Sequence, residues 1–328
     1  MSTIKDVASL AGVSICTVSR ALANKDYIKP ETRKRVLEAA EQLQYKPNHV
    51  AQSLKTGKTN TLALMLPDIT NMYYPIIAKH VEEYAAQRGY MILICNADMD
   101  LQKEMQLVEL LKKRNVDGVI ALPMSKSIAH IQTLAYQGIP YVFVNREFAD
   151  DPHCIPSDNV YGGYTVAKHL IARGKRKICG IFQSFENPIY EDRCRGVKAA
   201  LQEHGLGDSY FLYDVADMQD VHNRVEVFLG EEEYPDAFFV ANDMLAAGVY
   251  SAAYHRKLEI PRDISVAGYD NIAYAPMMIP PLTTFEQPEE EMAREAVDYL
   301  ISQIEDDAVP GKKFGKMRGR LVLRDSVA

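Results

Sequence analysis

The sequence predicts an all-α N-terminal head joined to a larger α/β body, which has two lobes built on doubly wound parallel sheets. Three observations lead to this fold class. Residues 1–60 show helical spacing of apolar side chains and end in a polar stretch over 56–60. Beyond residue 60, nearly unbroken apolar runs alternate with helical patterns in about eleven units, which is more than one sheet comfortably holds. At 328 residues, the chain is also long for a single hydrophobic core.

Three helices are expected in the head. The first spans residues 4–11, where apolar residues recur at i, i+3, i+4 and i+7 before Gly12 stops the helix. Ser14 is a good N-cap for the second helix, and Pro30 suits the first turn of the third. Two short helices joined by a tight turn at Gly12 form a helix-turn-helix, whose second helix fits the major groove of DNA. The alternative is a plain helical hairpin inside a larger bundle.

The charge distribution favours the DNA interpretation over that alternative. Residues 1–60 contain ten Lys and Arg against five acidic residues, a net charge of +5. The remainder contains 27 basic and 39 acidic residues, a net charge of −12. Because only the basic head attracts a polyanion, we expect the head to bind nucleic acid and the body to do something else.

The exposed face at the start of the second helix is expected to read the bases. It carries Ile15, Cys16, Thr17 and Arg20, while Val18 turns inward. An arginine such as Arg20 can bond guanine O6 and N7 bidentately, and an apolar side chain such as Ile15 can touch a thymine methyl group. For Cys16, we favour a place near the bases over burial as a small hydrophobe.

The body is expected to alternate strands and helices. Strands are predicted at 62–66, 91–95, 116–122, 141–144, 178–182, 211–213, 237–240, 264–269 and 319–323. Helices are predicted to begin near 74, 101 and 128 in the first lobe, and to end near 173, 201, 229 and 254 in the second. Ligands in such folds bind at the carboxyl ends of the strands, which here would face a cleft between the lobes.

Polar and aromatic side chains do follow the predicted strands, as a cleft for a polar small molecule requires. These positions include Asp68, Asn71, Tyr73, Tyr74, Asn145, Arg146, Asp158, Asn159, Arg193, Asn242, Asp243, Tyr269, Asp270 and Asn271.

At this level of detail the chain resembles the lactose-repressor/galactose-repressor (LacI/GalR) family of transcription regulators over essentially its whole length. In the head, the resemblance rests on Asp6-Val7-Ala8, Ala11-Gly12-Val13-Ser14, Thr17-Val18-Ser19-Arg20, Tyr45-Lys46-Pro47-Asn48 and Ala51-Gln52-Ser53-Leu54. In the body, it rests on Asp68-Ile69-Thr70-Asn71, Arg193 with Gly196, Val240-Ala241-Asn242-Asp243, Gly268-Tyr269-Asp270 and Pro280-Pro281-Leu282-Thr283-Thr284.

The resemblance implies three segments. They are a helix-turn-helix domain over 1–47, a hinge helix and linker over 48–60, and an effector-binding and dimerisation domain over 61–328. The last segment would be periplasmic-binding-protein-like, with an N-lobe of about 61–157 and 286–312 and a C-lobe of about 158–285 and 313–328.

The resemblance also implies which residues contact DNA. They are Thr3, Ile4, Ser14, Ile15, Cys16, Thr17, Ser19, Arg20 and Asn24 in the head, and Asn48, His49, Ala51 and Leu54 in the hinge. Hinge helices of two subunits would lie side by side in the minor groove, with Leu54 as the wedge that unstacks a base step. Ile15 and Cys16 stand where some family members have polar base readers, so the operator sequence stays open.

Effector contacts are implied for Tyr73, Tyr74, Asn145, Arg146, Asp158, Arg193, Asn242 and Asp270, with Tyr213 and Phe185 as secondary candidates. Several of these have structural alternatives. Asp158 and Asp243 could cap the helices that follow them, and Arg193 could form a surface ion pair. Asp270 could bond loop backbone, and the two tyrosines could simply pack within a lobe.

The charge of the effector stays open. Arg146 and Arg193 together would favour an anion such as a sugar acid or sugar phosphate. Arginine also bonds the hydroxyls of neutral sugars, so the sequence predicts a sugar or sugar derivative without fixing its charge.

Several other classes of protein are disfavoured. Gly57-Lys58-Thr59 lacks the earlier glycine and the strand of a phosphate-binding loop, and no other catalytic motif is present, so we expect no enzyme and no cofactor. The five cysteines lie far apart, which argues against a disulfide framework or a zinc site, and no metal is expected. No apolar run is long enough for a membrane helix, and residues 1–5 do not begin a signal peptide, so a cytoplasmic protein is expected.

The expected function is therefore that of a sequence-specific transcription regulator, most simply a repressor, that binds a near-palindromic operator as a homodimer. A small molecule in the interlobe cleft would change operator affinity, as inducer or corepressor. The chain stops soon after the strand over 319–323 without a heptad-repeat tail, so a tetramer is not expected. A protein co-regulator that binds the body is compatible with the sequence.

Overall fold

The structure is a computed structural model, and it describes residues 2–22, 27–45, 57–207, 209–305 and 312–328. Contacts within the chain separate two units, residues 1–59 and 60–328, which we describe in turn. The hinge helix expected over 48–54 lies outside the described residues. Among the described residues, no helix has both the length and the apolar character needed to cross a bilayer.

The first unit contains the three helices predicted for the head, α1 (Ile4–Ala11), α2 (Ile15–Leu22) and α3 (Pro30–Gln42). Each helix contributes one fully buried valine to a common core, namely Val7, Val18 and Val36. Pro30 occupies the first turn of α3, as predicted, because its missing N–H costs nothing there.

The N-lobe of the second unit contains a five-stranded sheet in the order β2-β1-β3-β4-β5, in which every pairing is parallel. The strands are β1 (Thr61–Leu66), β2 (Met91–Asn96), β3 (Gly118–Ala121), β4 (Tyr141–Val144) and β5 (Cys154–Ile155). One face packs against α5 (Tyr73–Gln87) and α12 (Glu289–Ile304). The other face packs against α6 (Leu101–Arg114) and the short α7 (Ala129–Gln132).

The C-lobe repeats this plan with a four-stranded parallel sheet in the order β7-β6-β8-β9. Its strands are β6 (Ile178–Ile181), β7 (Tyr210–Leu212), β8 (Ala237–Val240) and β9 (Ser265–Ala267). Helices α8 (Asn159–Ala172) and α9 (Pro188–Glu203) pack against one face, and α10 (Met218–Phe228) and α11 (Asp243–His255) against the other. The predicted fold class, a helical head and a body with doubly wound parallel sheets, is confirmed.

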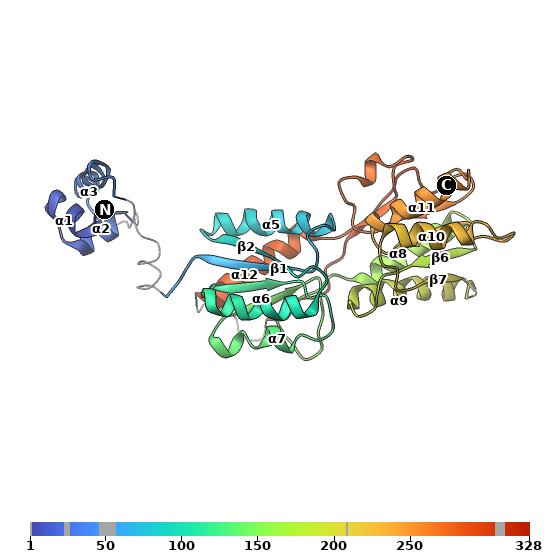
Figure 1. Ribbon diagram of the computed structural model, residues 1–328, viewed down its shortest axis with the longest axis horizontal. Helices are drawn as coiled ribbons and strands as arrows, with labels where there is room; N and C mark the ends of the chain where they lie inside the picture. Colours follow the sequence, from blue (N-terminus) through green and yellow to red (C-terminus); the bar gives the residue numbers. More distant parts are fainter. Residues whose placement is uncertain (1, 23–26, 46–56, 208, 306–311) are drawn as a thin grey trace. The chain divides into compact units, whose positions relative to one another are not determined.

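The chain passes between the lobes three times, because α12 belongs to the N-lobe although it follows the C-lobe strands (Figure 1). An antiparallel pair, β10 (Thr284–Glu286) with β11 (Arg320–Val322), joins two of the crossovers. Phe314 and Met317 still pack against the N-lobe core, whereas Leu321 packs against the C-lobe core. The last crossover therefore lies a few residues beyond the boundary expected at 313.

Two helices of the C-lobe approach each other unusually closely. A Cβ atom on Gly163 of α8 would overlap the carbonyl oxygen of Arg193, and one on Gly196 of α9 would overlap that of Val160. The two glycines thus let α8 and α9 pack backbone to backbone, which fixes the position of Arg193 on α9.

Candidate functional site

Helix α2 is positioned by the turn that precedes it. Gly12 adopts a left-handed φ of 64°, and the Val13 N–H donates to the Ala8 carbonyl at 3.0 Å. The Ser14 hydroxyl oxygen accepts a hydrogen bond from the Thr17 N–H at 3.1 Å, as the sequence predicts for an N-cap. Local hydrogen bonds therefore hold both ends of the turn and fix the direction in which α2 leaves it.

The residues proposed to read bases lie on the exposed face of α2. Ile15 is 44% exposed, and Cys16, Ser19 and Arg20 are exposed as well, while Thr17 is half-buried. The alternative of Cys16 as a buried small hydrophobe is wrong, because its thiol lies at the surface. An isoleucine and a thiol exposed on a helix gain from an apolar partner such as a thymine methyl group.

Tyr27 was not among the predicted DNA contacts, yet it lies beside one of them, Arg20. The guanidinium carbon of Arg20 stacks 5.5 Å from the centroid of the Tyr27 ring. No pattern in the sequence indicated this, because the two residues lie on different segments of the head.

The beginning of α1 holds two further proposed DNA contacts. Thr3 is exposed and forms a capping box with Asp6, since the Thr3 N–H donates to the Asp6 carboxylate at 2.7 Å. Ile4 is half-buried and packs against the head core. Asn24, Asn48, His49, Ala51 and Leu54 lie outside the described residues.

In the body, side chains from both lobes form one hydrogen-bonded chain. Asn145, at the end of β4, donates to the Tyr73 hydroxyl at 3.0 Å and to Gln287 Oε1 at 2.9 Å. Gln287, on the second crossover, donates in turn to Asp270 Oδ1 at 2.6 Å. Two predicted N-lobe residues are thus linked to a predicted C-lobe residue through Gln287.

Arg193 occupies the C-lobe side of this network. Its Nε donates to Asn159 Oδ1 at 2.9 Å, and its Nη2 lies 3.4 Å from Asp270 Oδ1. The guanidinium stacks 3.7 Å from the centroid of the Tyr269 ring. Asn159 also donates to Asn145 Oδ1 at 3.0 Å, which closes the network across the lobes. Because Arg193 is buried, the alternative of a surface ion pair is wrong.

Arg146, like Arg193, keeps an Nη2 without a hydrogen-bond partner among the described residues. It is buried, and it donates to the carbonyls of Pro123 and Asn145, each at 2.8 Å. Burial raises the pKa of the neighbouring Tyr74, and the charge of Arg146 opposes that rise. A buried guanidinium nitrogen without a partner can hold an acceptor oxygen of a ligand.

Two predicted effector residues cap helices with their side-chain oxygens. Asp158 accepts from the Tyr161 N–H at 3.0 Å and lies 3.2 Å from Arg318, so its capping alternative is realised. Asn242 caps α11 by accepting from the Leu245 N–H at 2.9 Å. The cap expected at Asp243 is therefore supplied by the residue before it.

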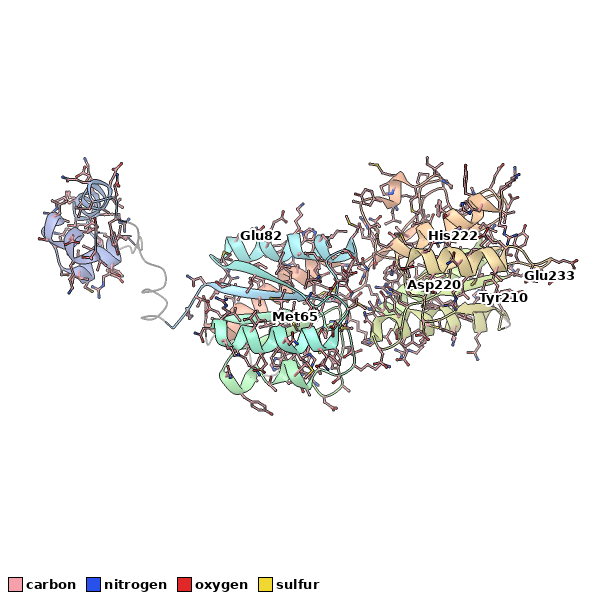
Figure 2. The ribbon with its side chains drawn as sticks, in the orientation of Figure 1. Met65, Glu82, Tyr210, Asp220, His222 and Glu233 are labelled. Atoms are coloured by element: carbon pink, nitrogen blue, oxygen red, sulfur yellow. The ribbon has the colours of Figure 1, made fainter. Side chains whose placement is uncertain are left out.

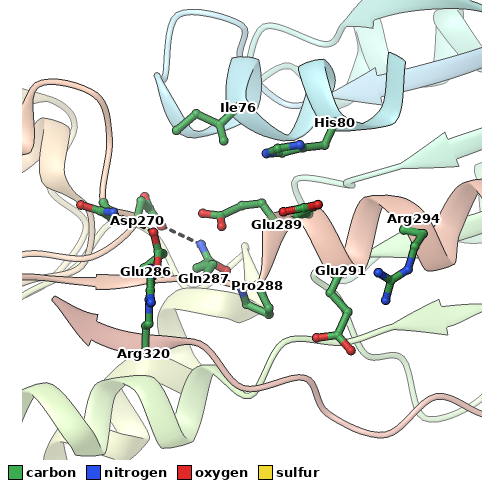
Figure 3. A pocket seen from close by; sticks show the side chains of 12 residues that line it. Ile76, His80, Asp270, Glu286, Gln287, Pro288, Glu289, Glu291, Arg294 and Arg320 are labelled. Carbon is green, nitrogen blue, oxygen red and sulfur yellow. Dashed lines mark hydrogen bonds and ion pairs between the residues drawn. The ribbon is translucent and has the colours of Figure 1, made fainter. Parts of the chain in front are cut away.

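A cavity of about 560 Å³ opens beside the network, where the β10–α12 crossover passes α5 (Figure 3). Figure 3 shows Glu289 between Gln287 and the part of α5 that carries Ile76 and His80. Burial raises the pKa of Glu289 to about 8. Burial likewise raises the pKa of Asp270 to about 6, although the charge of Arg193 opposes the rise.

Comparisons with known proteins agree with this architecture. Residues 3–48 match the model of bacterial regulatory proteins of the lacI family, and residues 167–327 match a periplasmic binding protein-like domain. The HTH-type transcriptional regulator DegA of Bacillus subtilis (strain 168) is 35% identical over 90% of this chain and 89% of its own length.

The chain belongs to the lacI family of bacterial regulatory proteins. It is a DNA-binding transcriptional repressor controlled by effector binding, and the prediction that it is not an enzyme is confirmed. A structure of the Lac repressor dimer bound to operator and the anti-inducer ONPF is similar with a TM-score of 0.87, at 25% identity over 100% of this chain and 99% of that one. A complex of the regulator CelR with cellobiose is similar with a TM-score of 0.74, at 26% identity over 99% and 100%.

The interlobe network of this lacI-family repressor contains polar residues that the sequence did not single out. Gln287 bridges the lobes, and Gln183 accepts hydrogen bonds from Tyr190 at 2.6 Å and from Asn242 at 3.0 Å. Tyr190 lies one turn before Arg193 on α9, so helical spacing could have indicated it. The two glutamines carried no such signal, because Gln287 lies on a crossover and Gln183 in a loop.

Proposed function

We propose that this repressor acts as a homodimer, binds a near-palindromic operator and responds to a sugar or sugar derivative held in the cleft between its lobes. The observation that supports the effector part is the buried network of Tyr73, Asn145, Arg193 and Asp270, whose members come from both lobes. A ligand that replaces these hydrogen bonds acts on both lobes at once.

The chemistry of the network favours a hydroxyl-rich ligand. Donors and acceptors alternate along it, and the aromatic rings of Tyr73 and Tyr190 lie beside them. A sugar hydroxyl both donates and accepts, so it can replace one amide or carboxylate in such a chain. CelR, a structural relative, is seen with cellobiose.

Arg146 is the residue that bears most directly on whether the effector is charged. Both arginines keep an Nη2 without a hydrogen-bond partner, but the charge of Arg193 is compensated by Asp270, whereas Arg146 has no ion pair among the described residues. We propose one anionic or hydroxyl-bearing group of the effector at Arg146. Calorimetry with matched sugars and sugar acids distinguishes an anionic effector from a neutral one. Equal or tighter binding of the neutral sugars would argue against an anionic effector.

Exposed apolar side chains support the dimer. Met91, Leu93 and Ile94 project from β2, the edge strand of the N-lobe sheet, and Met277 and Ile279 project from the C-lobe. Side chains of this size rarely cluster at the surface of a monomer, so a second copy of the chain is the proposed cover for both patches. A two-fold dimer presents two α2 helices to two half-sites, which gives the near-palindrome.

Coupling between effector and operator follows from the position of the cleft. Closure of the lobes changes the spacing of the two N-lobes in the dimer and hence of the two hinge segments. Coupling free energies of this kind are typically about 1–3 kcal/mol. The sign of the coupling, induction or corepression, is for experiment to decide.

The first test is selection of bound duplexes from a random pool, over a range of salt concentrations, with residues 1–60 present or deleted. Enrichment of a near-palindromic site that is lost on deletion supports the proposal. If only steeply salt-dependent binding without enrichment is found, the selection is repeated with pooled sugars and metabolites. Failure in both conditions would count against it.

Leu54 gives a more specific prediction. As the proposed minor-groove wedge, Leu54→Ala should weaken operator binding by about a few kcal/mol while leaving non-specific binding nearly unchanged, because only the bent operator accommodates the wedge. Fluorescence anisotropy with operator and scrambled duplexes measures both. Equal losses on the two duplexes would argue against a wedge.

A further inference from the structure

We propose that α10 and α11 of the C-lobe form a binding site for a divalent transition-metal ion, with His222, Glu226 and His255 as ligands. One nitrogen of each imidazole and one carboxylate oxygen all lie within 4.8 Å of one another. The site is separate from the effector cleft, because these two helices cover the opposite face of the sheet from α8 and α9.

The backbone holds the three residues together firmly. His222 and Glu226 are one turn apart on α10, so they project from the same side of the helix (Figure 2 labels His222). Gly248 lets α11 approach α10 so closely that a Cβ there would lie 2.5 Å from the Met218 carbonyl oxygen. His255 is the last residue of α11, and its ring meets that of His222 with centroids 4.8 Å apart.

The protein does not satisfy His222 by itself. The residue is only 9% exposed, and its Nδ1 has no hydrogen-bond partner among the described residues. Its Nε2 lies 3.5 Å from Glu226 Oε2, beyond ordinary hydrogen-bond length. A buried imidazole with unused polar atoms beside a carboxylate and a second imidazole is an arrangement that a metal ion stabilises.

The positive charge of Arg256 does not block the site. Its Nε lies 3.9 Å from Glu226 Oε1, whereas the other carboxylate oxygen, Oε2, faces His222. Glu226 can therefore keep its contact with Arg256 and offer Oε2 to a metal. His255 is exposed at a helix end, so its side chain can move the short distance that bond lengths near 2.0–2.1 Å require.

The ligand set indicates the class of metal. Two imidazoles and one carboxylate suit Zn²⁺, Co²⁺ or Ni²⁺ and do not suit Ca²⁺ or Mg²⁺, which prefer oxygen ligands. Three protein ligands leave at least one coordination position for water or another donor. No spacing in the sequence indicated this site, since His255 lies 33 positions after His222 on a different helix.

Zinc binding to the full-length protein tests the proposal by isothermal titration calorimetry. Wild type should bind one Zn²⁺ per chain at this site, and His255→Gln and Glu226→Gln should each weaken binding by about 100-fold or more, at or beyond the loss seen for outer partners of metal ligands. His204→Gln, which alters another exposed histidine of the C-lobe, should bind as wild type does. Circular dichroism confirms that each variant is folded.

A second metal excludes capture of zinc by the exposed thiol of Cys16. Co²⁺ bound to nitrogen and oxygen ligands lacks the strong near-ultraviolet charge-transfer band of a cobalt thiolate. We expect visible Co²⁺ absorption without that band in wild type, and its loss in His255→Gln. The proposal is overturned if wild type binds no Zn²⁺ at micromolar concentrations, if both ligand variants bind it unchanged, or if the cobalt spectrum is that of a thiolate alone.

Discussion

Glu289 is a carboxyl group almost removed from water, with only 8% of its surface exposed at the point where the chain enters α12. Burial raises its pKa from an ordinary value of 4.5 to about 8. The unfolded chain therefore releases this proton near pH 4.5 and the folded chain near pH 8. The stabilising contribution of the protonated group is complete below pH 4.5 and is lost as the pH rises to about 8.

Glu289→Gln should consequently flatten the pH dependence of stability. We expect the free energy of unfolding of wild type to fall more between pH 5 and pH 8 than that of the variant, by at most about 1.4 kcal/mol per pH unit. Urea denaturation at four pH values measures the difference. Glu291→Gln, an exposed residue of the same cavity, is the matched control and should follow wild type. Parallel curves for wild type and Glu289→Gln would refute the prediction.

Arg193 and Asp270 form a buried ion pair rather than a surface one, and the two arrangements predict different energies. Arg193→Met leaves the Asp270 carboxylate uncompensated and should cost about 3–5 kcal/mol of stability, whereas loss of a surface pair costs about 0–1. Adding Asp270→Asn to that variant should restore part of the loss, because no buried charge then remains. Thermal and urea denaturation of the single and double variants test this, and a loss below 1 kcal/mol would contradict it.

At the residue scale, the sequence predicted which segments supply the interlobe network better than which side chains do. Asp158 was favoured, but it caps α8, and the neighbouring Asn159 makes the contacts with Asn145 and Arg193. Both residues lie at the same strand end, and only the direction of the chain as it enters α8 decides between them. That direction depends on packing in three dimensions.

At the scale of helices and strands, capping and helix-breaking residues were sufficient to predict element boundaries. Gly12, Ser14 and Pro30 mark the helix boundaries of the head, and each does in the structure what its chemistry predicts. Strand β5 was missed, because two residues cannot show a pattern. The helix expected from residue 128 is only the four-residue α7 followed by a 3-10 turn, although Ile128, Ile131 and Leu134 are all buried in the N-lobe core.

The close packing of α8 against α9 gives a prediction about elements. Gly196→Ala would place a Cβ against the Val160 carbonyl oxygen, so the helices must separate. We expect a loss of about 1–3 kcal/mol of stability, as for other overpacked sites. Gly315→Ala, where a Cβ meets nothing within 4 Å, is the control and should change stability little. A Gly196→Ala variant as stable as wild type would show that the two helices can shift without cost.

At the scale of the whole molecule, the division of charge between residues 1–60 and the rest indicated two different tasks, and membership of the lacI family agrees with that division. The three crossovers were harder to locate, because a lobe assembled from separate segments has no boundary that local composition marks. The last one follows Met317, whose side chain belongs to the N-lobe core only through contacts with residues distant in sequence.

The proposed dimer gives the last prediction. Ile94 is 46% exposed on the edge strand β2, and the preceding residue, Leu93, is 40% exposed on the opposite face of the strand. Ile94→Lys places an ammonium group in the proposed interface, where it loses water without gaining a partner, so the dimer should dissociate. Operator affinity should then fall by about 100-fold or more, because each head binds its half-site without help from a linked partner.

Tyr136→Lys is the control for this prediction. It alters a side chain that is 90% exposed on the 3-10 turn after α7, and it should leave both the dimer and the operator affinity unchanged. Sedimentation velocity and operator titration measure the two properties separately. An Ile94→Lys variant that stays dimeric would place the interface elsewhere on the body, whereas a monomer that keeps full operator affinity would show that dimerisation is not what selects the operator.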